Sequence, residues 1–467
     1  MQERERLGSR LGFIMLSAGC AIGCGNVWKF PWMCGQNGGG SFMLLYILCL
    51  LVLGLPVMVM EFAVGRASQK SGALAYDVLE PNRRFHWFTW WGQIGCYVLL
   101  MFYTTVAGWM LAYIPKMASG ELSTTDPDVI AATFSGMLAD PAQLIGWMVV
   151  VVLIGFLVCR LGLQKGVERI TKVMMACLFV AIVILAINSI LLPNSGEGLA
   201  FYLLPDFSRL FAGDTVAEQM GTFGDAVYAA MGQAFFTLSI GASGMAIFGS
   251  YIGRDRRLTG EAISVAGLST MISLLAGLII FPACFSFGVS PDSGPNLVFV
   301  TLPSVFDQMW GGQLWGTLFF IFMSFAALST VIGVFENIVA FCMDQWGVSR
   351  RSAVAINAVL IIVLSVPCIL GFNVWQGVQF PGIGDIQSLE DFIVSNNVLP
   401  LGGLVYVLFC TSRYGWGWKN FLTEANTGAG PRFPKWAHAW IAYGIPVLMV
   451  VIFIMGYIPK FQIWLGL

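Results

Sequence analysis

The sequence predicts an all-α polytopic membrane protein with eleven transmembrane helices, arranged as a 5+5 inverted repeat with one extra C-terminal helix. Three observations lead to this fold class. The chain is 57% hydrophobic and only 10% charged, so lipid rather than water must cover most of its surface. Eleven apolar runs each approach the roughly 20 residues that a bilayer-spanning helix needs. Two of these runs, the first and the sixth, are interrupted by small and polar residues.

The apolar runs belong to one membrane domain over residues 1–467. Their centres lie near residues 22, 53, 101, 150, 180, 236, 272, 327, 361, 398 and 447. We expect the first repeat at about 8–195, the second at about 220–412, and the extra helix at about 436–457.

The basic residues indicate how the chain crosses the membrane. Of the 24 Lys and Arg, 20 precede the first run or follow the second, fourth, sixth, eighth and tenth. The positive-inside rule then places the N-terminus in the cytoplasm, and an odd number of spans places the C-terminus outside. We expect a bacterial inner membrane. On the outer side, the apolar segment from Gly294 to Pro303 either packs back onto the protein or forms a plain buried loop.

Composition argues against several classes of function. A net charge of −1 gives no basic surface for nucleic acid. The eleven Cys form no CxxC pair, and with two His they predict no Cys/His metal centre. The sequence has no HExxH, no nucleophile motif and no clustered acid pair, so we expect no enzyme activity. No charge ring or repeated filter sequence suggests a channel.

The interrupted runs point to a binding site inside the membrane. In the first run, Gly19 to Asn26 contains three glycines and a polar Asn, and in the sixth, Thr237 to Gly244 is similar. Unwound backbone at membrane depth is tolerated only where protein buries it or where it lines a cavity. The two breaks fall at matching positions of the two halves, as expected of inverted-repeat secondary transporters. The alternative is that small residues only allow close helix packing.

Four segments carry a family resemblance. They are RLGFIMLSAGCAIGCGNVWKFPWMCGQNGGGSF (Arg10 to Phe42), GVERITKVMM (Gly166 to Met175), GQAFFTLSIG (Gly232 to Gly241) and FAALST (Phe325 to Thr330). Together and in this order, they resemble the bacterial amino-acid transporters of the neurotransmitter:sodium symporter family. The resemblance covers essentially the whole chain. It implies sodium-coupled import of a neutral, hydrophobic or aromatic L-amino acid by alternating access. The alternative is a membrane amino-acid sensor or receptor that keeps the fold without transport.

The resemblance also implies a substrate site. Ala242 stands where leucine-type relatives carry a large aromatic residue, which favours a bulky substrate unless Met245 fills the space. Gly23 stands where monoamine carriers have Asp, which favours an amino acid with its own carboxylate. In the family, the hydroxyl at the position of Tyr103 meets that carboxylate. The implied substrate residues are Ala21, Cys24, Gly25, Leu99, Tyr103, Phe236, Thr237, Ser239, Ala242 and Val334.

One or two sodium sites follow from the same resemblance. One site maps to the carbonyls of Gly19, Ile22 and Ala326 and the hydroxyls of Ser329 and Thr330. The other maps to Ala21, Asn26, Thr237 and Ser269. Ser269 departs from the Asn or Asp usual in the family, and its shorter side chain puts direct contact with that ion in doubt.

The same region could hold chloride. Ser273 stands where chloride-independent relatives have Glu, so the predicted cluster lacks a fixed carboxylate. Its members are Tyr46, Gln233, Thr237, Ser269 and Ser273. A compensating acid elsewhere, such as Glu336, would make chloride unnecessary.

Charged residues within the spans match the family's gates. Lys29 and Asp391 correspond to the outer gate, where Lys in place of the commoner Arg predicts a looser contact. Arg4 and Asp344 correspond to the inner gate. Glu61 corresponds to a carboxylate that supports the unwound part of the sixth span. Lipid and a small amino acid are the expected partners, and the sequence predicts no oligomeric state.

Overall fold

The computed structural model describes residues 7–124, 126–288 and 296–465, and this part of the chain is helical with no strand. Short helices flank and connect the spans. They are α5 (Gly72–Leu79), η3 (His86–Phe88), α7 (Pro127–Ala139), α10 (Ser195–Leu203), η5 (Phe207–Phe211), η6 (Leu297–Thr301), α14 (Leu302–Asp307) and α19 (Trp418–Ala425).

The predicted spans coincide with the long helical stretches, several of which contain a π-helical turn. The first five are α1–η1–α2 (Arg10–Ala21, Gly25–Lys29, Phe30–Gln36), α3–η2–α4 (Gly40–Cys49, Leu50–Gly54, Leu55–Ser68), α6 (Trp91–Ala118), α8 (Pro141–Arg160) and η4–α9 (Leu163–Glu168, Arg169–Ile190). The next five are α11–α12 (Val216–Leu238, Gly244–Gly249), α13 (Leu258–Ser286), α15 (Gly312–Trp346), α16 (Arg350–Gly371) and α17–η7–α18 (Ile386–Ile393, Val394–Val398, Leu399–Thr411). The last is η8–η9–α20 (Lys435–Ala437, Trp440–Gly444, Ile445–Leu465).

Among the described residues, nine helical stretches are long and apolar enough to cross a membrane, and the bent pair of the first span makes ten. The remaining predicted span, the sixth, is α11–α12, and it is not among these ten. Its two halves have 23 and six residues. The count of eleven and the bounds of the two repeats therefore stay predictions.

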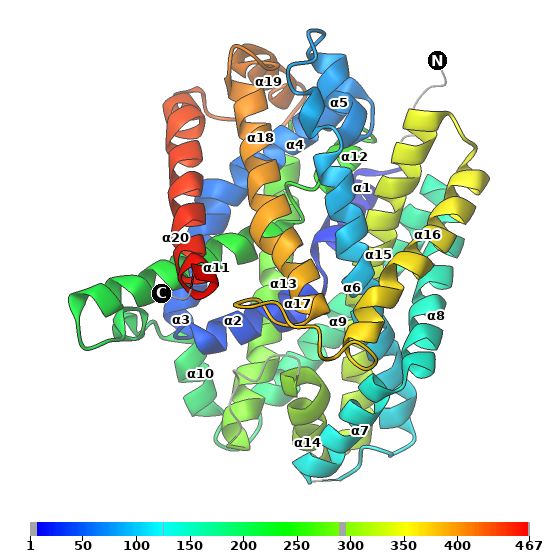
Figure 1. Cartoon of the computed structure of the whole chain (residues 1–467), viewed down its shortest axis with the longest axis vertical. Helices are drawn as coiled ribbons and strands as arrows, with labels where there is room; N and C mark the ends of the chain where they lie inside the picture. Colours follow the sequence, from blue (N-terminus) through cyan, green and yellow to red (C-terminus); the bar gives the residue numbers. More distant parts are fainter. Residues whose placement is uncertain (1–6, 125, 289–295, 466–467) are drawn as a thin grey trace.

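The two ends of the bundle separate the loops as predicted (Figure 1). The start of the described chain lies at the same end as α5 and α19, whereas α7, α10 and α14 lie at the opposite end. The apolar outer segment forms η6 and α14, with Leu297, Val298 and Phe299 fully buried. It therefore packs into the protein, although its first two residues lie outside the described ones.

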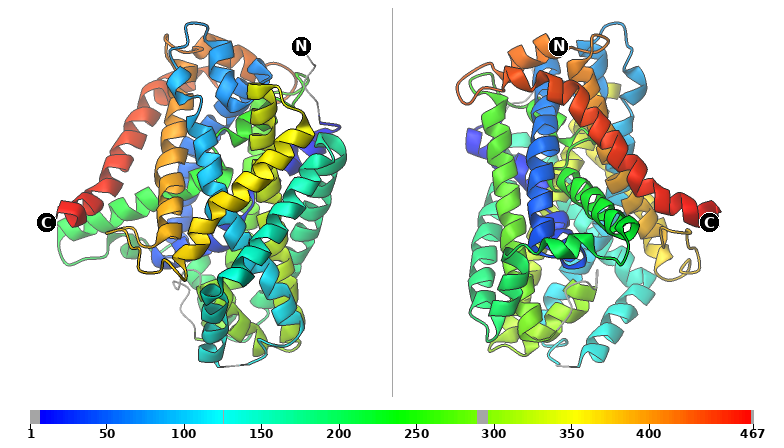
Figure 2. Two further views of the ribbon diagram at one scale, coloured as in Figure 1. Left: turned by 45° about the vertical axis from the view of Figure 1, so that its right-hand side comes forward. Right: turned by 90° about the vertical axis from the view of Figure 1, so that its left-hand side faces the viewer.

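The helix α15 lies at the centre of the bundle, and α11 and α20 lie at its periphery. α15 packs against α1, α6, α8 and α9. α20 runs obliquely along the outside of the bundle, and its C-terminal end lies beside α11 in both views of Figure 2.

Both interruptions appear where the glycines predicted them. The first span bends by 58° between Ala21 and Gly25. In the sixth, Ser239, Gly241 and Ser243 have φ of 50°, 93° and 62°. A Cβ on Gly241 would lie 2.0 Å from the carbonyl oxygen of Leu399, so only glycine allows this approach of the tenth span. At the two breaks, backbone groups turn from helical partners to side chains: the N–H of Cys24 donates to Tyr103, and the N–H of Gly241 donates to Glu61.

Candidate functional site

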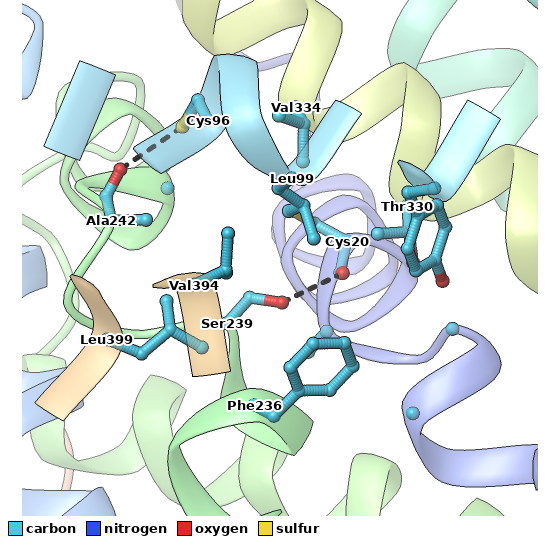
Figure 3. Close-up of a pocket in the computed structure, with 15 residues that line it drawn as sticks. Cys20, Cys96, Leu99, Phe236, Ser239, Ala242, Thr330, Val334, Val394 and Leu399 are labelled. Carbon is cyan, nitrogen blue, oxygen red and sulfur yellow. Dashed lines mark hydrogen bonds between the residues drawn. The ribbon is translucent and has the colours of Figure 1, made fainter. Parts of the chain in front are cut away.

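A buried cavity lies between the two breaks, and side chains from α6, α15 and the tenth span close it (Figure 3). Eight of the ten predicted substrate residues line it, namely Ala21, Gly25, Leu99, Tyr103, Phe236, Ser239, Ala242 and Val334. The other two lie next to it. Cys24 lines an adjacent outer cavity, and the hydroxyl of Thr237 turns to Gln233.

One wall of the cavity is polar and closely packed. The backbone N–H of Cys24 donates to the hydroxyl of Tyr103 at 2.8 Å. A Cβ on Gly23 would lie 2.1 Å from that hydroxyl oxygen and 2.4 Å from the hydroxyl oxygen of Thr330. Glycine is therefore the only residue that fits here, and an acidic side chain like that of the monoamine carriers has no room.

The opposite wall is apolar and lies around Ala242 (Figure 3). The thiol of Cys96 donates to the carbonyl of Ala242 at 3.3 Å. Met245 is not among the residues that line the cavity. It is fully buried, and its backbone N–H donates to Glu61. The space beside Ala242 therefore stays available to a ligand.

The sequence did not identify several residues of the cavity wall. Cys20 and Cys96 follow the helical faces of α1 and α6, but a buried Cys is ordinary packing in a membrane helix. Val394 and Leu399 come from the tenth span, whose approach to the cavity depends on the close contact at Gly241. No sequence motif signals either pair.

The first predicted sodium cluster brings five uncharged oxygen atoms together. The hydroxyl of Thr330 lies 3.4 Å from the carbonyl oxygen of Gly19, 3.3 Å from that of Ile22 and 3.5 Å from that of Ala326. The hydroxyl of Ser329 lies 3.3 Å from Ile22 O and 2.9 Å from Ala326 O. Three of the five atoms are backbone carbonyl oxygens, and two are side-chain hydroxyls. Backbone carbonyls at interrupted helices are ligands that coordinate Na⁺ in transporters. The residues present therefore fit sodium.

The second predicted sodium cluster is also assembled. The amide nitrogen of Asn26 lies 2.9 Å from the Ser269 hydroxyl, 3.0 Å from the Ser269 carbonyl and 3.0 Å from the Ser273 hydroxyl. The Ser269 hydroxyl donates to the carbonyl of Thr237 at 3.0 Å. Despite its short side chain, Ser269 thus contacts Asn26 and Thr237, while Ala21 lies on the wall of the central cavity.

Polar atoms without partners gather beside this cluster. Within the described residues, the hydroxyls of Tyr46 and Thr270 and the side-chain oxygen of Gln233 are buried and form no hydrogen bond. The Tyr46 hydroxyl faces Thr237, Ser273 and Thr270. A buried polar group without a partner costs about 1–3 kcal/mol, and hydroxyls can turn to donate to an anion. The hydroxyls of Tyr46 and Thr270 are therefore donors that an anion could use, whereas the Gln233 oxygen is only an acceptor.

The alternative acid does not belong to this cluster. Glu336 is fully buried, pairs with Arg350, and accepts from the hydroxyl of Tyr251 at 2.9 Å. Its charge is therefore balanced by partners of its own.

The predicted outer gate is closed by an ion pair. The ammonium of Lys29 lies 2.8 Å from each carboxylate oxygen of Asp391 and 3.0 Å from the hydroxyl of Ser395. It also lies 4.5 Å from the ring centroid of Phe236. The single ammonium nitrogen of Lys29 contacts both carboxylate oxygens, and the expectation that this contact is looser than an Arg pair stays a prediction. Tyr103 and Phe236 line both the central and the outer cavity, so they form part of the wall between them.

The predicted inner gate is described in part. Asp344 accepts from the backbone N–H of Ser71 at 2.7 Å, and its carboxylate lies 3.8 Å from the ammonium of Lys70. Arg4 lies outside the described residues, so its pairing with Asp344 stays a prediction.

A second inner contact comes from the GVERITKVMM segment. The carboxylate of Glu168 accepts from the backbone N–H of Gly8 at 2.8 Å and from the hydroxyl of Ser9 at 3.1 Å, and it pairs with Lys172 at 2.7 Å. Glu168 thus holds the chain just before the first span.

Glu61 supports the break of the sixth span. Its buried carboxylate accepts from the backbone N–H groups of Gly241 at 2.9 Å, Met245 at 3.1 Å and Ala246 at 3.4 Å. These are amides that the break leaves without helical partners. The carboxylate therefore stabilises the unwound backbone beside the cavity.

Comparisons with known proteins agree with this geometry. The model of the family described as "Sodium:neurotransmitter symporter family" matches residues 4–133 and 131–463. The sodium-dependent transporter YhdH of Bacillus subtilis is 35% identical over 455 residues, which cover 97% of this chain and 98% of YhdH. The mouse sodium- and chloride-dependent GABA transporter 2 is 25% identical over 503 residues, covering 98% of this chain and 80% of the transporter.

A solved structure extends the comparison to the fold. The crystal structure of MhsT in complex with L-phenylalanine has a TM-score of 0.86 and 35% identity, and the match covers 97% of this chain and 99% of MhsT. The chain is therefore a multi-pass membrane protein that belongs to the sodium:neurotransmitter symporter family.

Proposed function

We propose that this protein is a symporter that uses a sodium gradient to import a neutral, hydrophobic or aromatic L-amino acid by alternating access. One observation carries the proposal. Thr330 contributes to the five-oxygen cluster, and the same hydroxyl lies against Gly23 beside Tyr103, on the wall of the closed cavity. An ion bound at that cluster and a ligand bound in the cavity would order the same segment of the first span. Such a shared segment makes the two binding events favour each other.

The chemistry of the cavity supports an amino acid. The substrate carboxylate would be met by the Tyr103 hydroxyl and by backbone amides near the first break, whose helix N-terminus favours negative charge. The ammonium would be met by carbonyls near Ala21 and Phe236. The side chain would lie against Leu99, Val334 and Ala242. MhsT, which shares 35% identity, was crystallised with L-phenylalanine, and this favours a substrate of that size.

Uptake of labelled phenylalanine, tryptophan, tyrosine and leucine into proteoliposomes tests the substrate class. Each would be measured with an inward sodium gradient and with choline in its place. We expect sodium to stimulate uptake of at least one of them. Sodium-dependent binding without uptake would instead support the alternative, a membrane sensor or receptor. The closed gate argues against that alternative, since a sensor does not need one.

Replacing Ala242 with Phe tests the pocket. The ring would fill the space beside Leu99 and Val334, and overpacking of this kind costs about 1–3 kcal/mol. We expect the affinity for phenylalanine and tryptophan to fall about 5- to 150-fold, and the affinity for alanine to change much less. Competition binding across an amino-acid series measures this. The matched control is Ala132→Phe on exposed α7, and equal losses for large and small ligands would contradict the pocket assignment.

We also propose that chloride binds beside the sodium cluster at Tyr46, Gln233, Thr237, Ser269 and Ser273. The unpartnered Tyr46 hydroxyl supports this. Replacing chloride with gluconate at constant sodium should lower uptake, and Ser273→Glu should remove that dependence by supplying a fixed negative charge. Wild-type uptake that is unchanged in gluconate would contradict a chloride site.

The family and the distribution of basic residues also suggest the membrane and the orientation of the protein. We propose a bacterial inner membrane, with the end that carries α5 and α19 facing the cytoplasm. One or two sodium ions would accompany each substrate.

A further inference from the structure

Two consecutive acids in α17 point to different surroundings. Asp391 pairs with Lys29, and its side chain is 34% exposed. Glu390 is 4% exposed and is the buried residue of this helix. α17 packs against α6, α16 and η7, so Glu390 is enclosed by protein while its neighbour faces the outer cavity.

The carboxyl of Glu390 has no charge partner. Within the described residues, both of its oxygens are buried and accept no hydrogen bond. The Cys368 thiol of α16, a weak donor, interacts with this carboxyl and also with Thr105 of α6. Asp385, at the start of α17, is the other titratable group that acts on it, and it is also an acid. η7, with the sequence VSNNV, carries no titratable group.

An ionised carboxylate is not compatible with these surroundings. Burying an unpaired charge costs several kcal/mol, and the group becomes neutral instead. Among the described residues, no Lys, Arg or His acts on this carboxyl, and Asp385 adds repulsion. Glu390 therefore carries a proton in this conformation.

The position of Glu390 relates this proton to the gate. Gln387, Ser388 and Asp391 of the same short helix line the outer cavity. Opening the gate requires the Lys29–Asp391 pair to separate, which moves α17 away from the first span and lets water from the outer cavity approach its buried side. A hydrated Glu has an ordinary acidity, with a pKa of about 4.3 in model peptides, and would ionise at neutral pH.

We propose that Glu390 is a proton-binding site linked to the outer gate, protonated while the gate is closed and ionised when it is open. On opening, the carboxyl gives its proton to water in the outer cavity and becomes a carboxylate. On closing, it takes one proton back from the same side. This proposal rests on the proposed function in one respect, because it takes the Lys29–Asp391 ion pair to be the outer gate.

The direction of the pH effect follows from linkage. Closing binds a proton, so a lower external pH favours the closed form. While the closed form holds its proton and the open form is ionised, the closing equilibrium falls by up to about tenfold for each pH unit of increase, and it levels off once the closed form also loses its proton. In Glu390→Gln, which stays neutral, this dependence should disappear.

Infrared difference spectroscopy on the purified protein tests the protonation state without any substrate. A protonated carboxyl has a C=O stretch that is separate from the carboxylate bands. At neutral pH, we expect the intensity of this band to fall by the contribution of one carboxyl in Glu390→Gln. The control is Glu197→Gln, which replaces an exposed Glu of α10 and should leave the intensity unchanged. A melting curve verifies that each variant is folded. Identical wild-type and Glu390→Gln spectra in this region would overturn the proposal.

A gate variant tests the linkage. Lys29→Met removes the cation that holds Asp391 and should hydrate Glu390, so the band should shrink at neutral pH. By charge alone, losing a nearby cation would favour protonation, so a loss of the band reports hydration and not electrostatics. A band retained in full would overturn the link to the gate. Neither spectrum depends on transport, so failure of this proposal is distinguishable from failure of the proposed function.

Discussion

Thr330→Ala should remove most of the coupling between sodium and uptake. The Thr330 hydroxyl contacts the carbonyl oxygens of Gly19, Ile22 and Ala326, so its loss takes one of five oxygen ligands and loosens the break in the first span. A hydrogen bond or ligand contact to a charged group contributes about 1.5–3 kcal/mol. We therefore expect the apparent sodium affinity to fall about 10- to 150-fold, as measured by the sodium dependence of uptake and of thermal stability.

The matched control is Thr317→Ala on the same helix. The Thr317 hydroxyl donates to the carbonyl of Gln313, so this variant removes a threonine hydroxyl far from the cluster. We expect its sodium dependence to equal that of the wild type. If Thr330→Ala also keeps the wild-type sodium dependence, the five-oxygen cluster is not a sodium site.

Tyr103→Phe should cause a comparable loss of substrate binding. The Tyr103 hydroxyl accepts from the backbone N–H of Cys24 at 2.8 Å and lies on the cavity wall. Removing it leaves that buried amide unpartnered and takes one hydrogen bond from the substrate carboxylate. Hydrogen bonds to charged groups contribute about 1.5–3 kcal/mol. We expect affinity for the amino acid to fall about 10- to 150-fold, as measured by equilibrium binding at saturating sodium.

A second tyrosine on the same helix provides the control. Tyr113 is fully buried, and its hydroxyl has no hydrogen-bond partner among the described residues. Tyr113→Phe therefore makes the same chemical change without touching the cavity and should leave binding unchanged. Equal losses in the two variants would indicate a general effect on the helix. Wild-type binding in Tyr103→Phe would remove this residue from the site.

The helix breaks were predictable from the sequence because their cause is local. Glycine is costly in a helix interior, so three glycines between Gly19 and Asn26 predict a break wherever they occur in a span. The structure places the bend there and shows why one of them is required. At Gly23, any side chain would collide with Tyr103 and Thr330.

The contribution of the tenth span was not predictable in the same way. Val394 and Leu399 reach the cavity because that span lies against Gly241, and the distance between such segments is set by tertiary packing. The same holds for Ser395, which contacts both members of the outer gate. A Ser between apolar residues gives no sequence signal of that role.

The charged residues were predictable in identity but only partly in partnership. Lys29 and Asp391 pair as the motif indicated. Glu168 was recognised only as part of a segment that carries the family resemblance, although it binds the chain at Gly8 and Ser9. Glu390 could not be distinguished from an ordinary surface acid, because its burial depends on how α17 sits between α6 and α16.

Concentrative uptake is the most direct test of a sodium-coupled symporter. Purified protein in proteoliposomes would be given labelled phenylalanine or leucine with an inward sodium gradient, and the internal and external concentrations would be compared over time. The account predicts that the amino acid accumulates inside above its external concentration and that a sodium ionophore collapses the accumulation. Uptake that only equilibrates, or that proceeds equally in choline, would contradict sodium coupling.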